Sequence, residues 1–173
     1  MKHKFLLLYS WFVRTSLFFL PDMPIVMRFR GFMYGLGMKK YGGDFQVPHD
    51  VILRDLENIS IGRNCIIGNG TNIMGSGTIV IEDKVLIGPN VIIISSNHTL
   101  GGDSFSGRSV AGTITICKGA WVAGNCTIQK DSFLPPLSVL SANSFLNKEF
   151  DNPESLYGGV PAKWIKSIKT AQE

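Results

Sequence analysis

A six-residue repeat runs through most of this chain of 173 residues and limits the folds that it can adopt. Each unit begins with an aliphatic residue and carries a small or short residue at its fifth position. The aliphatic residues are Ile61, Ile67, Ile73, Ile81, Ile87, Ile116, Val122, Ile128, Leu134 and Leu140. The fifth positions are Cys65, Thr71, Gly77, Val85, Val91, Ala120, Cys126, Ser132, Ser138 and Ser144. No helical period of about 3.6 fits this spacing, and so short a repeat indicates a solenoid whose units bury their apolar side only by stacking.

The spacing also predicts the structure of one unit. The fifth position of one unit and the first of the next are two residues apart, so both side chains point to the same side of a β-strand. The residues between are rich in Gly, Asn, Asp and Lys, which tolerate the backbone angles of a corner. Three such strands and corners make a triangular coil of about 18 residues that pairs with its neighbours through parallel ladders. The predicted fold class is therefore an all-β solenoid.

Two regions depart from the repeat. Residues 95–112 are polar and rich in Gly and Ser, and a loop of this length within a compact repeat is generally functional, so we expect an extruded active-site loop here. Both ends of a solenoid need a cover. We expect an N-terminal helical segment and lead-in over 1–46, the β-helix over 47–146, and a tail over 147–173 in which Pro161 begins a short C-terminal helix.

The N-terminal segment from Phe5 to Leu20 is strongly apolar. It contains Arg14 and is shorter than the roughly 20 apolar residues of a membrane-spanning helix. It ends in Leu20-Pro21-Asp22, without the small residues of a signal-peptide cleavage site. Two interpretations stay open: a helix that packs on its own protein or oligomer, and a helix that lies in a membrane interface.

Composition excludes several classes of protein. Hydrophobic residues make up 45% and charged residues 17%, which excludes a disordered chain. The net charge of +4 is too small and too diffuse to predict a nucleic-acid partner. The odd number of cysteines, without a CxxC pair, favours buried thiols in a reducing compartment over disulfides or zinc. The three histidines are far apart in the sequence, so no metal site is expected.

Three segments resemble the hexapeptide-repeat acetyltransferases: GAWVAGNCTI from Gly119, LSANSFLNKE from Leu140, and GGVPAKWIK from Gly158. The resemblance extends over roughly residues 37–166 and is to the galactoside and maltose acetyltransferase branch. It implies a left-handed parallel β-helix, and the left hand comes from the resemblance alone, since parallel crossovers are usually right-handed. It also implies a homotrimer that binds acetyl-CoA in clefts between subunits.

The resemblance implies that His98, at the start of the extruded loop, is the catalytic base. An imidazole titrates near neutrality and can accept the proton of a hydroxyl that attacks the acetyl thioester directly. No Ser-His-Asp or Cys-His spacing suggests an acyl-enzyme. The partner that orients the imidazole stays open between Asn97, Glu57 and backbone carbonyls, and the donor to the oxyanion is unassigned.

The resemblance also implies the binding residues. Small residues at corners let the pantetheine arm approach the backbone, and lysines pair with phosphates. The acetyl-CoA contacts are expected at Gly124, Ala142, Asn147, Lys148, Lys163 and Lys166, and the acceptor contacts at Trp121 and Asn97. Two departures weaken single contacts: the tail has lysines where relatives often have arginine, and Asn147 replaces a more usual threonine.

The opening of the chain looks more like acetyltransferases that modify capsule, O-antigen or colanic acid. We therefore expect an O-acetyltransferase acting on a sugar hydroxyl of a surface polysaccharide or its lipid-linked precursor. Its expected location is the cytoplasm, with membrane contact through residues 5–20. A streptogramin- or chloramphenicol-type drug acetyltransferase and a non-catalytic β-helix scaffold stay as alternatives.

Overall fold

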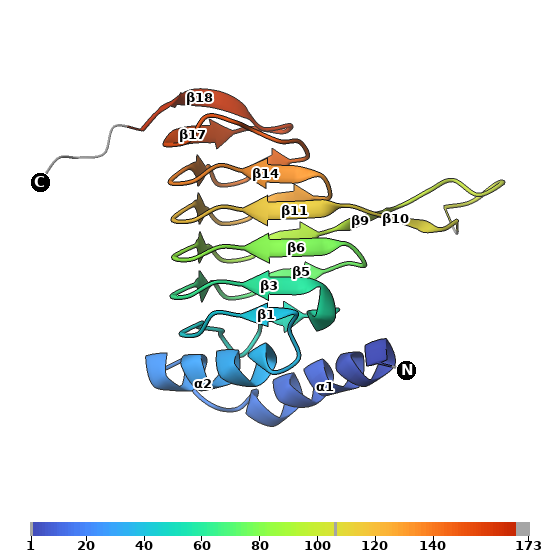
Figure 1. Ribbon diagram of the computed structural model, residues 1–173, viewed down its shortest axis with the longest axis vertical. Coiled ribbons are helices and arrows are strands. Elements are labelled where there is room, and N and C mark those ends of the chain that lie inside the picture. Colours follow the sequence, from blue (N-terminus) through green and yellow to red (C-terminus); the bar gives the residue numbers. More distant parts are fainter. Residues whose placement is uncertain (1, 106, 169–173) are drawn as a thin grey trace, which may run out of the picture.

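The structure is a computed structural model that describes residues 2–105 and 107–168. A prism of stacked strands stands on two helices, and a hairpin projects from its side (Figure 1). The helices are α1 (Lys2–Leu17) and α2 (Pro24–Gly35), and a short 3-10 turn, η1, covers Leu56–Asn58. The predicted parallel β-solenoid and the N-terminal helical segment are confirmed.

The prism has three faces, each a sheet of parallel strands from successive coils. Face A contains β1 (Lys40–Tyr41), β3 (Ile59–Ile61), β6 (Thr78–Ile81), β11 (Thr113–Ile116) and β14 (Ser132–Leu134). Face B contains β4 (Ile66–Ile67), β7 (Leu86–Ile87), β12 (Trp121–Val122), β15 (Val139–Leu140), β17 (Ser155–Gly158) and β18 (Lys163–Ser167). Face C contains β2 (Ile52–Leu53), β5 (Asn72–Met74), β8 (Ile92–Ile94), β13 (Thr127–Gln129) and β16 (Phe145–Leu146). The chain passes from A to B to C, so we name the corners A–B, B–C and C–A.

The interior of the prism is the predicted core. Every aliphatic first position and every small fifth position of the repeat is buried. Two of the buried hydroxyls bond to carbonyls of the next coil, Thr71 Oγ1 to Gly88 O at 3.0 Å and Ser132 Oγ to Leu146 O at 3.2 Å. The small polar residues therefore fill the corners without leaving a buried donor unpaired.

The backbone angles at the corners explain why Asn or Asp often occupies the fourth position of the repeat. Asn64, Asn90, Asn125, Asp131 and Asn143 all have φ between 55° and 61°, in the left-handed region. Asn and Asp enter this region at lower cost than most other non-glycine residues. Five corners therefore turn at an Asn or Asp of the repeat, whereas Lys84 and Leu137 occupy this position, with φ of 58° and 54°, at two others.

The prediction of a C-terminal helix that begins at Pro161 is wrong. Residues 163–167 form the strand β18, which runs antiparallel to β17. The chain reverses at Gly159, whose φ of 103° suits glycine, and returns along the last parallel strand of face B. The strand pairing satisfies backbone groups that β17 would otherwise leave open at a sheet edge, which a helix would not do.

The two helices cover the other end of the prism. Helix α1 buries Leu6, Ser10 and Val13 against the first coil, and Ser10 Oγ donates a hydrogen bond to Leu53 O. Helix α2 approaches so closely that a Cβ on Gly31 would lie 1.9 Å from Phe45 O. The segment from Phe5 to Leu20 thus packs on its own protein along one face of α1.

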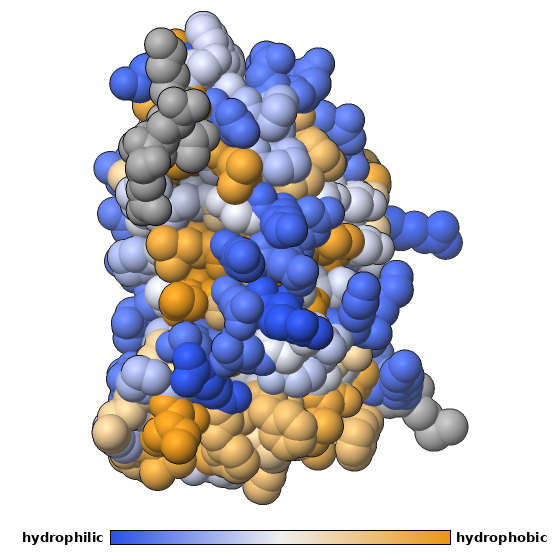
Figure 2. Space-filling model, turned by 60° about the vertical axis from the view of Figure 1, so that its left-hand side comes forward, coloured by the Kyte–Doolittle hydropathy of each residue, from blue (hydrophilic) through white to orange (hydrophobic). Residues whose placement is uncertain are grey.

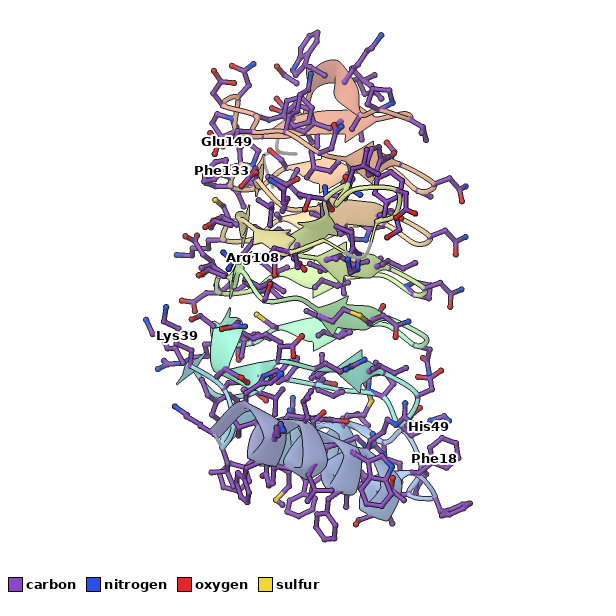
Figure 3. The ribbon with its side chains drawn as sticks, turned by 90° about the vertical axis from the view of Figure 1, so that its right-hand side faces the viewer. Phe18, Lys39, His49, Arg108, Phe133 and Glu149 are labelled. Atoms are coloured by element: carbon purple, nitrogen blue, oxygen red, sulfur yellow. The ribbon has the colours of Figure 1, made fainter. Side chains whose placement is uncertain are left out.

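A buried arginine holds the linker between the helices. Arg30 is 1% exposed, and its guanidinium donates to Val47 O at 2.6 Å, Leu20 O at 3.1 Å and Asp22 Oδ1 at 3.1 Å. Asp22 also lies 2.7 Å from Nδ1 of His49, whose ring meets Phe18 (Figure 3). Burial raises the pKa of the Asp22 carboxyl, but hydrogen bonds from His49 and the charge of His49 outweigh it, so the pKa lies below its usual value.

The outward face of the helices is apolar, and Figure 2 shows it as the hydrophobic base under a largely polar prism. Its exposed side chains are Phe5, Leu8, Trp11, Phe12, Phe19, Met23, Ile25, Phe29, Phe32 and Leu36. We call this set the apolar base. Within the part of the chain that the structure describes, no helix is long and apolar enough to cross a membrane.

Candidate active site

The predicted extruded loop is a β-hairpin that leaves the prism at the C–A corner. Strand β9 (Ser96–His98) follows β8, and β10 (Ser109–Ala111) returns antiparallel to it, with His98 opposite Ser109. The repeat then resumes in register, because β11 pairs with β6 of the coil below. His98 therefore lies on regular structure, at the base of the projecting arm (Figure 1).

Ser95 fixes the point where the hairpin leaves the prism. Its fully buried hydroxyl donates to Gly77 O at 2.9 Å and accepts from Gly77 N–H at 3.1 Å. Its carbonyl accepts from Gly112 N–H at 2.9 Å, where the hairpin ends. A Cβ on Gly77 would lie 2.1 Å from Gly112 O, so only glycine fits this crossing. One residue thus ties both ends of the arm to the coil below.

His98 lines an open cavity of about 520 Å³ at the C–A corner. Asn97, one of the two residues predicted to bind the acceptor, lines the same cavity, whereas Trp121 does not. The floor is a column of residues from successive coils, Met74, Ile94 and Gln129, which pair in register across face C. The cavity has room for a sugar-sized ligand beside the imidazole.

Several residues that line this cavity were not expected from the sequence. Arg54, Asp55, Ser76 and Gln129 line it, and none of them was predicted. The repeat held a usable signal, since Arg54, Met74, Ile94 and Gln129 each follow the buried central residue of a strand on face C.

The orienting partner of His98 stays unassigned. Glu57, one of the candidates, lies 2.6 Å from Nδ1 of His3 through its Oε1. Asp55 accepts a hydrogen bond from Gly75 N–H at 2.9 Å. Among the described residues of this single chain, none makes a hydrogen bond to the His98 ring.

The residues expected to bind acetyl-CoA fall into two groups. Val122 and Leu140 pair in register on face B. Gly124 and Ala142 each follow one of them by two residues, so they lie on the B–C corner in adjacent coils. Asn147 and Lys148 follow β16 at the C–A corner, on the side of the His98 cavity. Face C separates the two groups, so one chain does not bring them together.

Trp121 and the tail lysines lie on face B. Trp121 pairs with Val139, Val139 with Leu156, and Leu156 with Lys166, so Trp121 and Lys166 share one outward column. Lys163 and Lys166 are exposed on β18, which Trp164 anchors by donating from Nε1 to Ser155 Oγ at 3.2 Å. Lys148, in contrast, lies 5.0 Å from the centre of the Phe150 ring.

The cysteines do not serve as nucleophiles. Cys65, Cys117 and Cys126 are free and buried. Burial, with a smaller contribution from Glu82, raises the pKa of the Cys117 thiol to about 11, and burial raises the pKa of the other two. The reactive thiolate is therefore scarce at neutral pH. Over the residues 2–105 and 107–168, no three His, Cys, Asp or Glu side chains form a group that could hold a metal ion.

Comparison with known proteins finds a similar enzyme of known activity. Galactoside O-acetyltransferase from Escherichia coli K12 is 30% identical over 112 residues, which are 64% of this chain and 55% of that protein. The chain is a relative of the hexapeptide-repeat acetyltransferases. The chain therefore matches only about half of that enzyme's length. The resemblance inferred from the repeat is thus confirmed. No protein-family model matches the chain.

Solved structures show the same fold. A hexapeptide-repeat-containing acetyltransferase from Vibrio cholerae, complexed with acetyl coenzyme A, aligns with a TM-score of 0.83 over 96% of this chain and 89% of that one, at 24% identity. A polySia-specific acetyltransferase aligns with a TM-score of 0.61 over 76% of this chain and 57% of that one, at 26% identity. The fold is therefore shared with the Vibrio cholerae acetyltransferase over nearly the whole chain, and with the polySia-specific acetyltransferase over about three quarters of it.

The contacts of Ser95 lead to a prediction about the hairpin. Ser95→Ala leaves the N–H and C=O of Gly77 without a hydroxyl partner, which we expect to lower the free energy of unfolding by about 1–3 kcal/mol. Amide hydrogen exchange should accelerate over residues 96–98 and 109–111. Ser60→Ala, on the outer side of β3, is the matched control and should change stability by less than about 0.5 kcal/mol. Equal effects of the two variants would remove Ser95 as the anchor.

Proposed function

We propose that this protein is an acetyl-CoA-dependent O-acetyltransferase that acetylates a sugar hydroxyl of a surface polysaccharide or its lipid-linked precursor. The observation that carries the proposal is His98 on the wall of an open cavity, at the exit of the arm from a prism that aligns with an acetyl-CoA-bound acetyltransferase. The relationship to galactoside O-acetyltransferase supports a carbohydrate acceptor. The polySia-specific relative supports a polymeric one.

The proposed mechanism uses His98 as a general base. Its imidazole accepts the proton of the acceptor hydroxyl as the oxygen attacks the thioester carbonyl of acetyl-CoA. The tetrahedral intermediate collapses to the acetyl ester and expels the coenzyme A thiolate. That thiolate recovers the proton from the imidazolium, so the protein ends the cycle unchanged.

We propose that the active site is completed between subunits of a homotrimer. Gly124 and Ala142 lie on the B–C corner, whereas His98 and Asn147 belong to the C–A corner. Setting the B–C corner of one subunit against the C–A corner of the next gathers both groups around one acetyl-CoA. Three subunits related by rotation give three such clefts.

The trimer can be tested by subunit complementation. Light scattering should give about three times the chain mass of 19.0 kDa, as expected for a closed ring of identical interfaces. Ala142→Glu blocks one corner and His98→Ala removes the base from the other, so each variant should be inactive alone. Refolding the two together should restore part of the activity, because some clefts then pair two intact corners. A fully active monomer would contradict the proposal.

Removing the imidazole should abolish most of the turnover. His98→Ala is expected to lower kcat by about 100-fold or more, because general base catalysis contributes a factor of this size. Calorimetry should find coenzyme A affinity nearly unchanged. His49→Asn, a histidine substitution on the first coil, is the control and should stay within a few-fold of the wild type. A His98→Ala enzyme of near-normal turnover would exclude this residue from the chemistry.

The tail lysines should bind the phosphates of the donor. Lys163 and Lys166 are exposed on β18 of face B, and an ammonium group pairs with phosphate as a point charge. Lys163→Ala and Lys166→Ala should each raise the KM for acetyl-CoA more than they lower kcat. The difference should shrink at high salt, because ions screen exposed charges. Unchanged donor affinity in both variants would assign these lysines to the solvated surface.

We further propose that the apolar base contacts the cytoplasmic face of a membrane. Phe5, Leu8 and Phe12 are each more than half exposed. Among the first 41 residues of the sequence, the only acidic one is Asp22. An exposed apolar face with a basic surround suits an anionic lipid surface.

Vesicle binding tests this contact. The full chain should co-sediment with vesicles of anionic phospholipid, and the double variant Leu8→Glu/Phe12→Glu should not, because two charges would enter the apolar layer. Val160→Glu introduces the same charge at the far end of the prism and should leave vesicle binding intact. If the wild type ignores the vesicles, the apolar base has another role.

A further inference from the structure

Three adjoining cavities form one track from His98 to the apolar base. The His98 cavity shares Arg54 with a second cavity of about 370 Å³ between α1 and β2. The second cavity shares Trp11 with a third, of about 420 Å³, on the outer side of α1. Because single side chains border two cavities each, the three follow one another along the base of face C.

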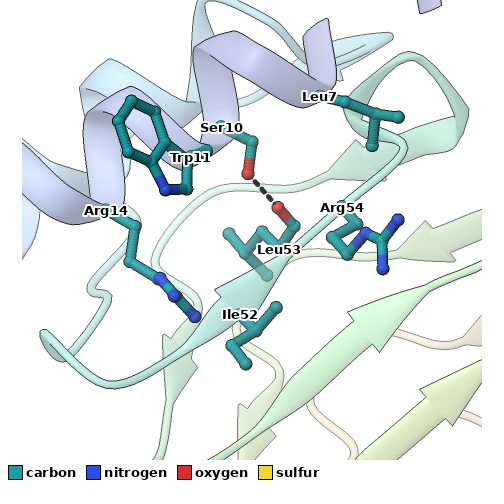
Figure 4. A pocket seen from close by; sticks show the side chains of 7 residues that line it. All are labelled: Leu7, Ser10, Trp11, Arg14, Ile52, Leu53 and Arg54. Carbon is teal, nitrogen blue, oxygen red and sulfur yellow. Dashed lines mark hydrogen bonds between the residues drawn. The ribbon is translucent and has the colours of Figure 1, made fainter. Parts of the chain in front are cut away.

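The second cavity is dibasic. Arg14 from α1 and Arg54 from the end of β2 flank it, above a floor of Ile52 and Leu53 (Figure 4). Neither guanidinium makes a side-chain hydrogen bond or an ion pair with any residue in the described part of the chain. The Arg30 guanidinium, by contrast, donates hydrogen bonds to the carbonyls of Val47 and Leu20. Two unpaired guanidinium groups at one groove attract a group with more than one negative charge.

The acidic side chain that follows Arg54 in the sequence is already engaged. Asp55 follows Arg54 in the chain and lines the His98 cavity. Its Oδ2 accepts from Gly75 N–H at 2.9 Å, and its Oδ1 lies 3.9 Å from Nδ1 of His3. Arg54 therefore keeps its charge available toward the groove.

The third cavity is apolar throughout. Its lining is Phe5, Leu8, Tyr9, Trp11 and Phe12. Four of these side chains are at least half exposed, so much of their apolar surface faces outward. A hydrocarbon chain that lay here would remove this surface from water.

We propose that the track binds an amphiphilic acceptor, in which a sugar is joined through a phosphate or diphosphate to a hydrocarbon chain. The sugar occupies the His98 cavity, the phosphate lies between Arg54 and Arg14, and the hydrocarbon follows Trp11 onto the apolar base. A sugar carrying only a carboxylate or phosphate would use the first two cavities and leave the third empty. The inference rests on the proposed function for the sugar position alone.

Calorimetry with three probes tests whether the track binds a charged group and a hydrocarbon chain together. Geranyl diphosphate combines charge and hydrocarbon, inorganic pyrophosphate has only the charge, and geraniol has only the hydrocarbon. We expect the full chain to bind geranyl diphosphate at least about tenfold more tightly than either fragment. Arg14→Gln and Arg54→Gln should each weaken its binding by about tenfold, the effect of losing a charge-assisted contact. Lys118→Gln, an equal loss of charge on the A–B corner, should have no effect.

Several results would overturn the inference. Pyrophosphate binding as tight as that of geranyl diphosphate indicates a simple anion site. Equal binding of geraniol, or insensitivity to both arginine variants, indicates an apolar surface without phosphate recognition. If none of the three probes binds, the track is not a binding site. His98→Ala should keep full affinity for geranyl diphosphate. Binding of this probe therefore tests the track independently of acetyl transfer, and either can fail while the other succeeds.

Discussion

The burial of one aliphatic column inside the prism is the constraint on which the rest of the structure depends. No coil can hide its own Ile, Val or Leu side chains, so each coil is stable only between two others. The parallel ladders fix the register from coil to coil, as Ile61, Ile81, Ile116 and Leu134 show on face A. The outer side of every strand is then free to vary, and all the candidate functional residues except the glycines point there or leave the prism.

The candidate catalytic residue is placed by a break in the repeat that does not disturb the core. The arm leaves after Ser95 and returns at Gly112, and the next strand resumes on the coil below without a shift. An insertion whose ends are already close costs little additional loop-closure entropy. The prism thus acts as a rigid support, while the two strands of the arm carry His98 to the edge of face C.

The two ends of the prism are closed in different ways. At the C-terminal end a backbone hairpin between β17 and β18 completes the sheet of face B. At the N-terminal end, two helices cover the first coil through Leu6, Ser10 and Val13, and Arg30 fixes their linker. The helices bury one side and expose an apolar opposite side, so the N-terminal end of the molecule carries the apolar base. The position of the apolar base sets the direction of the proposed acceptor track, which runs from the His98 cavity to the base.

The amino-acid sequence by itself determined the solenoid, its buried positions, the N-terminal helix and the place of the extruded arm with His98. These follow from local periodicity, which a stacked repeat converts directly into structure. The C-terminal strand was decided by the open edge of β17, which local propensity at Pro161 does not register. The cavity around His98 also needed the tertiary structure, because Arg54, Met74, Ile94 and Gln129 come from four coils and meet only through the register of face C. Arg14 and Arg54, 40 residues apart in the sequence, become neighbours only when α1 docks against the first coil.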